Sequence, residues 1–241
     1  MATVHTINLI IHVISGFTAL TTGLVPMIAK KGGKAHLLWG TVYFWAMFGV
    51  FVTSIVSWLQ EPHRAFLQYL MFIGFFSFHF TLTGVRTLRL KKAADRATTF
   101  DWAVAWVAIL GGAGITLLGA TTIVRGWMGG TDIVFYNYLY LGFGFFFAKN
   151  GWLDVKQFSG KLPLEKMHWF YSHISRMVGA YIATVTAFCV VNASNFPSFV
   201  PPLVIWTMPG VIGAFGIARW IRYYRAKFNP AAKTLLRLFS E

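Results

Sequence analysis

Acidic residues and cysteines are scarce in this 241-residue chain, and each scarcity excludes a class of protein or site. The chain has seven Asp and Glu against 21 Lys and Arg, and only 12% of its residues are charged. A soluble domain is typically about 25% charged, so this chain has too few charges to cover a water-facing surface. Cys189 is the only cysteine, which excludes an intrachain disulfide and any CxxC metal or redox motif.

The sequence also lacks the motifs of several enzyme classes. It contains no P-loop, no GxSxG and no HExxH. The acidic side chains are expected in loops or at the ends of apolar runs, at Glu61, Asp95, Asp101, Asp132, Asp154 and Glu165. This placement argues against a carboxylate proton relay and against magnesium held by paired aspartates.

Apolar sequence, by contrast, is abundant. The chain is 56% hydrophobic, with 24 Phe and ten Trp. A helix that crosses a bilayer needs about 20 mostly apolar residues, and seven segments fit: 7–29, 36–59, 65–85, 102–124, 133–148, 168–191 and 199–221. The fifth is the shortest and carries Asn137 and three tyrosines. The prediction is an all-α integral membrane protein, with one seven-helix domain over residues 1–221 and a basic amphipathic tail over 222–241.

The basic residues support this count because they alternate between the connections. Eighteen of the 21 lie in the connections after the first, third, fifth and seventh segments, and two, Arg64 and Arg125, lie on the other side. Basic loops stay cytoplasmic, so we expect the N-terminus outside, the C-terminus in the cytoplasm and a location in the cytoplasmic (inner) membrane. Anionic lipid headgroups account for the net charge of +14 without nucleic acid. Residues 151–164 and the tail are expected to lie on the inner surface as short amphipathic stretches.

Four histidines, His12, His36, His79 and His173, lie in or at the mouth of these runs. An ionisable residue at membrane depth is costly and is a functional candidate by default. At about 1.5 Å per helical residue, His36, His79 and His173 share the cytoplasmic leaflet, whereas His12 lies in the outer half. Without acidic neighbours, they are expected either to bind a metal or haem iron or to hydrogen bond between helices.

The sixth run is the densest in such residues. His173, Arg176, Met177 and Tyr181 fall on one helical face. Arg176 is the only basic residue well inside a run, and no acidic partner is evident in the sequence. A buried guanidinium needs an anion or several carbonyls, so Arg176 is expected to hold a haem propionate or a lipid phosphate, or else to extend toward the headgroups.

These residues predict a b-type haem held by His79 and His173, with Arg176 at a propionate and His36 able to replace either ligand. Two alternatives stay open. His36, His79 and His173 could form an open three-histidine site for zinc or copper, or the chain could bind no cofactor, with its histidines hydrogen bonded across helices.

Three segments carry a resemblance to a known family. They are 173–192 (HISRMVGAYIATVTAFCVVN), His12-x3-Gly16-x2-Ala19 and Lys31-Gly-x2-Ala-His36-x3-Gly40. They resemble an uncharacterised bacterial family of multi-span membrane proteins, known as a domain of unknown function, over most of the chain. The resemblance implies a helical inner-membrane protein and no activity. A looser similarity links the chain to haem b membrane cytochromes of the cytochrome b561 and ferric-reductase type, which carry a histidine pair in each leaflet, where this chain offers only His12 in the outer one.

The leading functional prediction is therefore a b-type haem protein that moves electrons to or from quinone or a partner membrane subunit. A second is a non-enzymatic accessory or scaffold subunit of a membrane complex. A third is a small-solute transporter or sensor with its site near the midplane, although the chain shows no clear inverted repeat.

Overall fold

The computed structural model describes residues 2–92, 95–129, 135–163 and 165–228. These residues form seven α-helices and two short 3-10 turns, with no strand among them. The helices are α1 (Ala2–Ile28), α2 (Lys34–Gln60), α3 (Ala65–Arg86), α4 (Thr99–Trp127), α5 (Phe135–Phe158), α6 (His168–Val191) and α7 (Pro202–Phe228).

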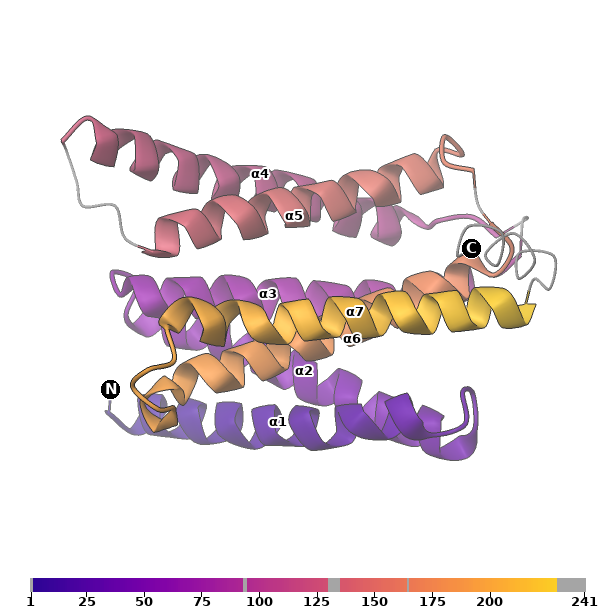
Figure 1. Cartoon of the computed structure of the whole chain (residues 1–241), viewed down its shortest axis with the longest axis horizontal. Helices are drawn as coiled ribbons and strands as arrows, with labels where there is room; N and C mark the ends of the chain where they lie inside the picture. Colours follow the sequence, from indigo (N-terminus) through magenta and orange to yellow (C-terminus); the bar gives the residue numbers. More distant parts are fainter. Residues whose placement is uncertain (1, 93–94, 130–134, 164, 229–241) are drawn as a thin grey trace.

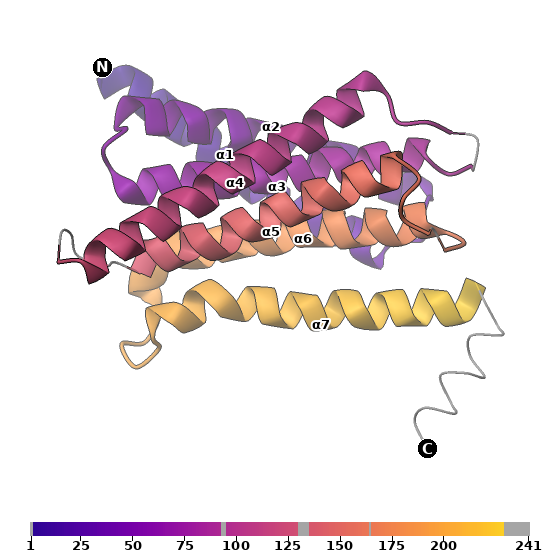
Figure 2. The same cartoon turned by 90° about the horizontal axis from the view of Figure 1, so that it is seen from above.

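The helices run side by side in three groups (Figures 1 and 2). Helices α1, α2, α3 and α6 pack together as a four-helix unit, and α7 packs on the α6 side of it. Helices α4 and α5 form a tight hairpin that lies as a separate layer against α3 (Figure 1). Helix α5 packs mainly on α4 and α7 mainly on α6, so α5 and α7 make little contact with each other.

Six of the helices, all except α5, are long and apolar enough to cross a membrane. Their outward faces carry many exposed large apolar side chains, such as Ile14, Leu110 and Phe215. A surface of this kind is unfavourable in water and suits lipid contact. The prediction of an all-helical protein with membrane-spanning segments is therefore confirmed in this coarser form.

Helix α5 corrects one prediction. The sequence predicts a span that ends at residue 148 and a separate surface segment from 151, but α5 is one continuous helix from Phe135 to Phe158. Asp154 and Val155 are buried within it, so the separate surface segment is wrong over residues 151–158. Helix α7 likewise continues through the start of the predicted tail to Phe228, and residues 229–241 lie outside the described part of the chain.

Glycines explain why α4 and α5 pack so closely. A Cβ atom on Gly112 would lie 2.4 Å from the backbone nitrogen of Ala148, and one on Gly144 would lie 2.5 Å from that of Thr116. Atoms cannot approach this closely, so both positions require glycine for the observed helix separation. The hairpin is thus built by backbone contact rather than by interlocking large side chains.

Two ion pairs fasten this hairpin to the rest of the protein, both at the end where α3 finishes. Arg86 of α3 pairs with Asp101 of α4, with Nη2 of Arg86 2.9 Å from Oδ2 of Asp101. Arg176 of α6 pairs with Asp154 of α5. Asp101 also completes the capping box that starts α4, since its carboxylate accepts from the Thr98 backbone N–H at 2.8 Å.

Candidate functional site

A cavity of about 590 Å³ lies between α3, α5, α6 and α7. Ligand sites in proteins usually fall between about 300 and 1,000 Å³, so this cavity is large enough for a small molecule. Residues of both α5 and α7 line it, although these two helices pack mainly on α4 and α6. We call it the cleft.

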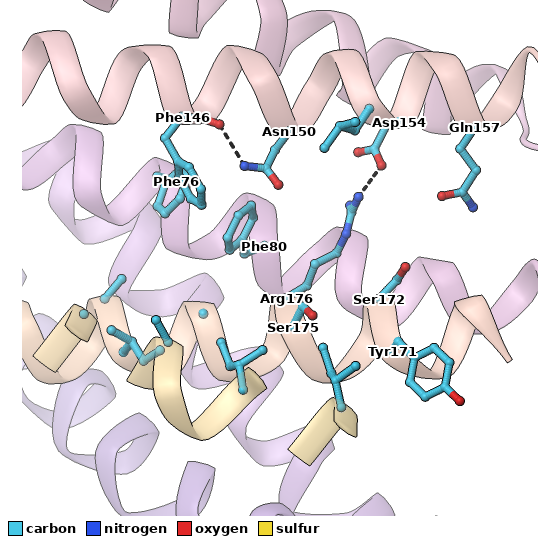
Figure 3. Close-up of a pocket in the computed structure, with 18 of the residues that line it drawn as sticks. Phe76, Phe80, Phe146, Asn150, Asp154, Gln157, Tyr171, Ser172, Ser175 and Arg176 are labelled. Carbon is cyan, nitrogen blue, oxygen red and sulfur yellow. Dashed lines mark hydrogen bonds and ion pairs between the residues drawn. The ribbon is translucent and has the colours of Figure 1, made fainter. Parts of the chain in front are cut away.

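The cleft has an apolar end and a polar end (Figure 3). The apolar end lies toward the N-terminal part of α5 and is lined by Ile73, Phe76, Phe143, Phe146 and Trp206. The polar end lies toward the C-terminal part of α5 and is lined by Asn150, Asp154, Gln157, Ser172, Ser175 and Arg176. A site divided in this way suits an amphiphile, a molecule with an apolar body and a polar head.

The Arg176–Asp154 ion pair forms one wall of the polar end (Figure 3). The side chains are 14% and 5% exposed, so both charges are withdrawn from water and each depends on the other. The expectation that Arg176 has no acidic partner is therefore wrong. Asp154 also corrects the expectation that every carboxylate lies in a loop or at the end of a run.

A second ion pair, between Arg225 of α7 and Glu165, stands at the mouth of the polar end. The Nε atom of Arg225 lies 2.9 Å from Oε2 of Glu165, and both side chains are nearly half exposed. Exposure makes this pair weaker than a buried one. It nevertheless connects α7 to the segment just before α6, because Glu165 lies three residues ahead of His168, where α6 begins.

His79, one of the two predicted haem ligands, is buried, and its ring contacts α5. Its ring packs edge to face against Phe147 of α5, with centroids 4.9 Å apart, and its Nε2 atom has no hydrogen-bond partner among the described residues. His173 instead donates from Nδ1 to the carbonyl of Gly84 at 2.8 Å. Gly84 follows His79 by five residues, which is about 140° around the helix, so the two rings make different contacts, and haem ligation by His79 and His173 stays a prediction.

His173 is brought beside His36, with ring centroids 6.2 Å apart. His36 Nδ1 donates to the carbonyl of Pro26 at 3.0 Å. Because a carbonyl only accepts, both rings carry a proton on Nδ1 and leave Nε2 free to accept or to bind a metal. Lys31 and Lys91 lie within electrostatic reach of His173, which makes this end of α2 and α6 strongly basic.

The remaining predicted residues link helices. Nδ1 of His12 lies 2.8 Å from Oγ1 of Thr53, which joins α1 to α2. The Tyr181 hydroxyl donates to the carbonyl of Leu20 at 2.9 Å, which joins α6 to α1. Among the residues that the structure describes, no three His, Cys, Asp or Glu side chains gather as a metal ligand set, so the alternative three-histidine site is not formed.

Apart from Arg176, the residues of the polar wall were not predicted from the sequence, although their spacing indicates them. Asn150, Asp154 and Gln157 are spaced by four and three residues, which places them on one face of α5. Ser172, Ser175 and Arg176, at positions i, i+3 and i+4, likewise share one face of α6. Two such polar faces in otherwise apolar helices indicate a shared polar site. Comparison with family models, curated proteins and solved structures found no match, so the chemistry of the cleft has to be derived from its own residues.

Proposed function

We propose that this protein is a multi-pass membrane protein that binds a lipid-soluble amphiphile in the cleft between α3, α5, α6 and α7. The observation that carries the proposal is the division of one 590 Å³ cavity into an aromatic end and a polar end. Binding serves transport, sensing or delivery of the amphiphile to a partner subunit, and a quinone is one compound of this kind.

The lack of close packing between α5 and α7 supports entry from the bilayer. Helices α5 and α7 border the cleft but pack on α4 and α6 rather than on each other. Figure 2 shows α7 set apart from the hairpin side of the molecule. An apolar molecule dissolved in the membrane can therefore reach the cleft sideways, without crossing water.

The proposal includes seven spans, with α5 as the fifth. Its 24 residues extend about 36 Å, which exceeds the roughly 30 Å of a hydrocarbon core. The buried Asn137 and Asp154 face protein rather than lipid. The distribution of basic residues then puts the N-terminus outside and the polar end of the cleft in the cytoplasmic leaflet of the inner membrane.

Two glycines of α7 offer a matched test. A Cβ atom on Gly210 or on Gly216 would meet nothing within 4 Å, but only Gly210 lines the cleft. Gly210→Phe should fill the cleft and Gly216→Phe should add a ring to the outer surface. Mass spectrometry of compounds extracted from the purified proteins should find an amphiphile in the wild type and in Gly216→Phe, and little in Gly210→Phe. Equal amounts in all three would refute the proposal.

A second candidate function, haem binding for electron transfer, is favoured by the arrangement of His36 and His173. Both rings present a free Nε2, and haem iron is commonly held by histidine. With Arg176 paired to Asp154, the cations left for propionates are Lys31 and Lys91.

The visible spectrum of the purified protein tests this candidate. A Soret band should be present in the wild type, should be lost in His36→Ala and in His173→Ala, and should persist in His79→Ala. Loss in His79→Ala alone would restore the ligand predicted from the sequence, and absence of any Soret band would exclude haem binding by this protein.

A further inference from the structure

The charged side chains that line the cleft cancel in pairs. They are Asp154, Glu165, Arg176 and Arg225, and they form the Arg176–Asp154 and Arg225–Glu165 ion pairs. The polar end therefore has no net charge from these four groups, although the chain as a whole carries a net charge of +14. In this balance of charge the cleft differs from the basic surfaces, which attract anionic lipids.

A charged head group would disturb this balance. An anion that binds Arg176 would lie beside the carboxylate of Asp154 and would weaken the Arg176–Asp154 ion pair. A cation that binds Asp154 would weaken the same ion pair and leave Arg176 without its partner. Leaving one member of a buried ion pair without its partner costs more than a single new charge-assisted hydrogen bond returns. Both kinds of charged head are therefore disfavoured.

Apart from the imidazole of His168, the polar groups that remain carry no charge near neutral pH. Gln157, Ser172 and Ser175 line the polar end, and the amide of Asn150 donates to the carbonyl of Phe146 at 2.8 Å and keeps its oxygen as an acceptor. Amides and hydroxyls both donate and accept hydrogen bonds. They match a head group that carries a carbonyl, an amide or a hydroxyl.

From this geometry we infer that the occupant of the cleft is an uncharged amphiphile whose head is recognised by hydrogen bonds alone. The inference rests on the proposed function and narrows it to a ligand class. Neutral quinones, fatty amides and monoacylglycerols belong to this class, whereas phospholipid anions and fatty amines do not.

Three probes with one chain and different heads test the inference: oleamide, oleyl phosphate and oleylamine. Binding is measured in nanodiscs of zwitterionic lipid, and only the part that is lost in Gly210→Phe is counted, because the basic surface attracts anions on its own. In the wild type, oleamide should bind at least tenfold more tightly than either charged probe.

Asp154→Asn and Arg176→Gln should reverse the preference for an uncharged head group. Asp154→Asn leaves the Arg176 charge unbalanced and should raise the affinity for oleyl phosphate at least tenfold over the wild type. Arg176→Gln leaves Asp154 unbalanced and should favour oleylamine in the same way. If either variant does not fold, Glu165→Gln, in the half-exposed pair, should give a smaller shift toward the phosphate.

The outcomes distinguish failure of the proposed function from failure of the inference about the uncharged head group. If Gly210→Phe lowers the binding of none of the probes, the proposed function itself fails. If it does lower binding but oleyl phosphate or oleylamine binds the wild type best, the cleft is a ligand site and the uncharged-head inference is overturned.

Discussion

The buried Arg176–Asp154 pair should be stable only while both partners are present. Asp154→Ala leaves a guanidinium withdrawn from water without its carboxylate, and we expect the free energy of unfolding to fall by about 3–5 kcal/mol. The double variant Asp154→Leu/Arg176→Met removes both charges and should regain most of that loss. Denaturant unfolding in detergent measures both. A double variant as unstable as Asp154→Ala would contradict the mutual dependence of the two charges.

His12 and Thr53 offer a second test on the scale of residues, because their hydrogen bond joins two helices. A double-mutant cycle with His12→Ala and Thr53→Val should give a coupling of about 0.6 kcal/mol and at most about 1.7 kcal/mol, as for other hydrogen bonds between membrane helices. Unfolding of the four proteins in the same detergent measures it. A coupling of zero would mean that the His12–Thr53 bond does not help to join α1 to α2.

The α4–α5 hairpin, on the scale of elements, depends on glycine at close approaches. Gly112→Leu would force its side chain against the backbone at Ala148, and overpacking of this kind costs about 1–3 kcal/mol or more. Gly114→Leu, two residues away in open space, should change stability by less than about 0.5 kcal/mol. Thermal unfolding of the two variants provides the comparison. A similar melting temperature for both would argue against backbone contact as the basis of the hairpin.

Six of the seven helices could be predicted from the sequence because each buries its backbone polar groups within a long apolar run. Helix α5 was predicted only in part. Its second half contains Lys149, Asp154 and Lys156, and such a charged sequence predicts a surface segment. In the structure it is part of the helix, and Asp154 pairs with Arg176 of α6. That pairing joins residues 22 positions apart, and local patterns carry no information about it.

For the whole molecule, the orientation proposed from the basic residues can be tested with thiol labelling, because Cys189 is the only cysteine to remove. In a Cys189→Ala background, His63→Cys and Lys161→Cys place thiols at two exposed connections. A membrane-impermeant maleimide added to intact cells should label position 63 and should reach position 161 only after the membrane is opened. The opposite pattern would invert the proposed topology.

The site was less predictable than the fold. The sequence singled out the histidines and Arg176, and in the structure Arg176 lines the cleft, while His79 contacts Phe147 and His173 contacts Gly84. Which face of a helix meets which neighbour depends on tertiary packing. A cavity between four helices exists only in three dimensions, so its volume and its polar end could not be read from spacing alone.

Ligand binding in the cleft can be tested by photocrosslinking. An oleamide analogue with a diazirine next to the amide, activated in membranes and mapped by peptide mass spectrometry, should label α5 around residues 150–157 and α6 around residues 172–176. Excess oleamide should prevent this labelling, and so should Gly210→Phe. Labelling that is spread over the lipid-facing surfaces of α1, α2 and α4, and that neither excess oleamide nor Gly210→Phe reduces, would contradict ligand binding in the cleft.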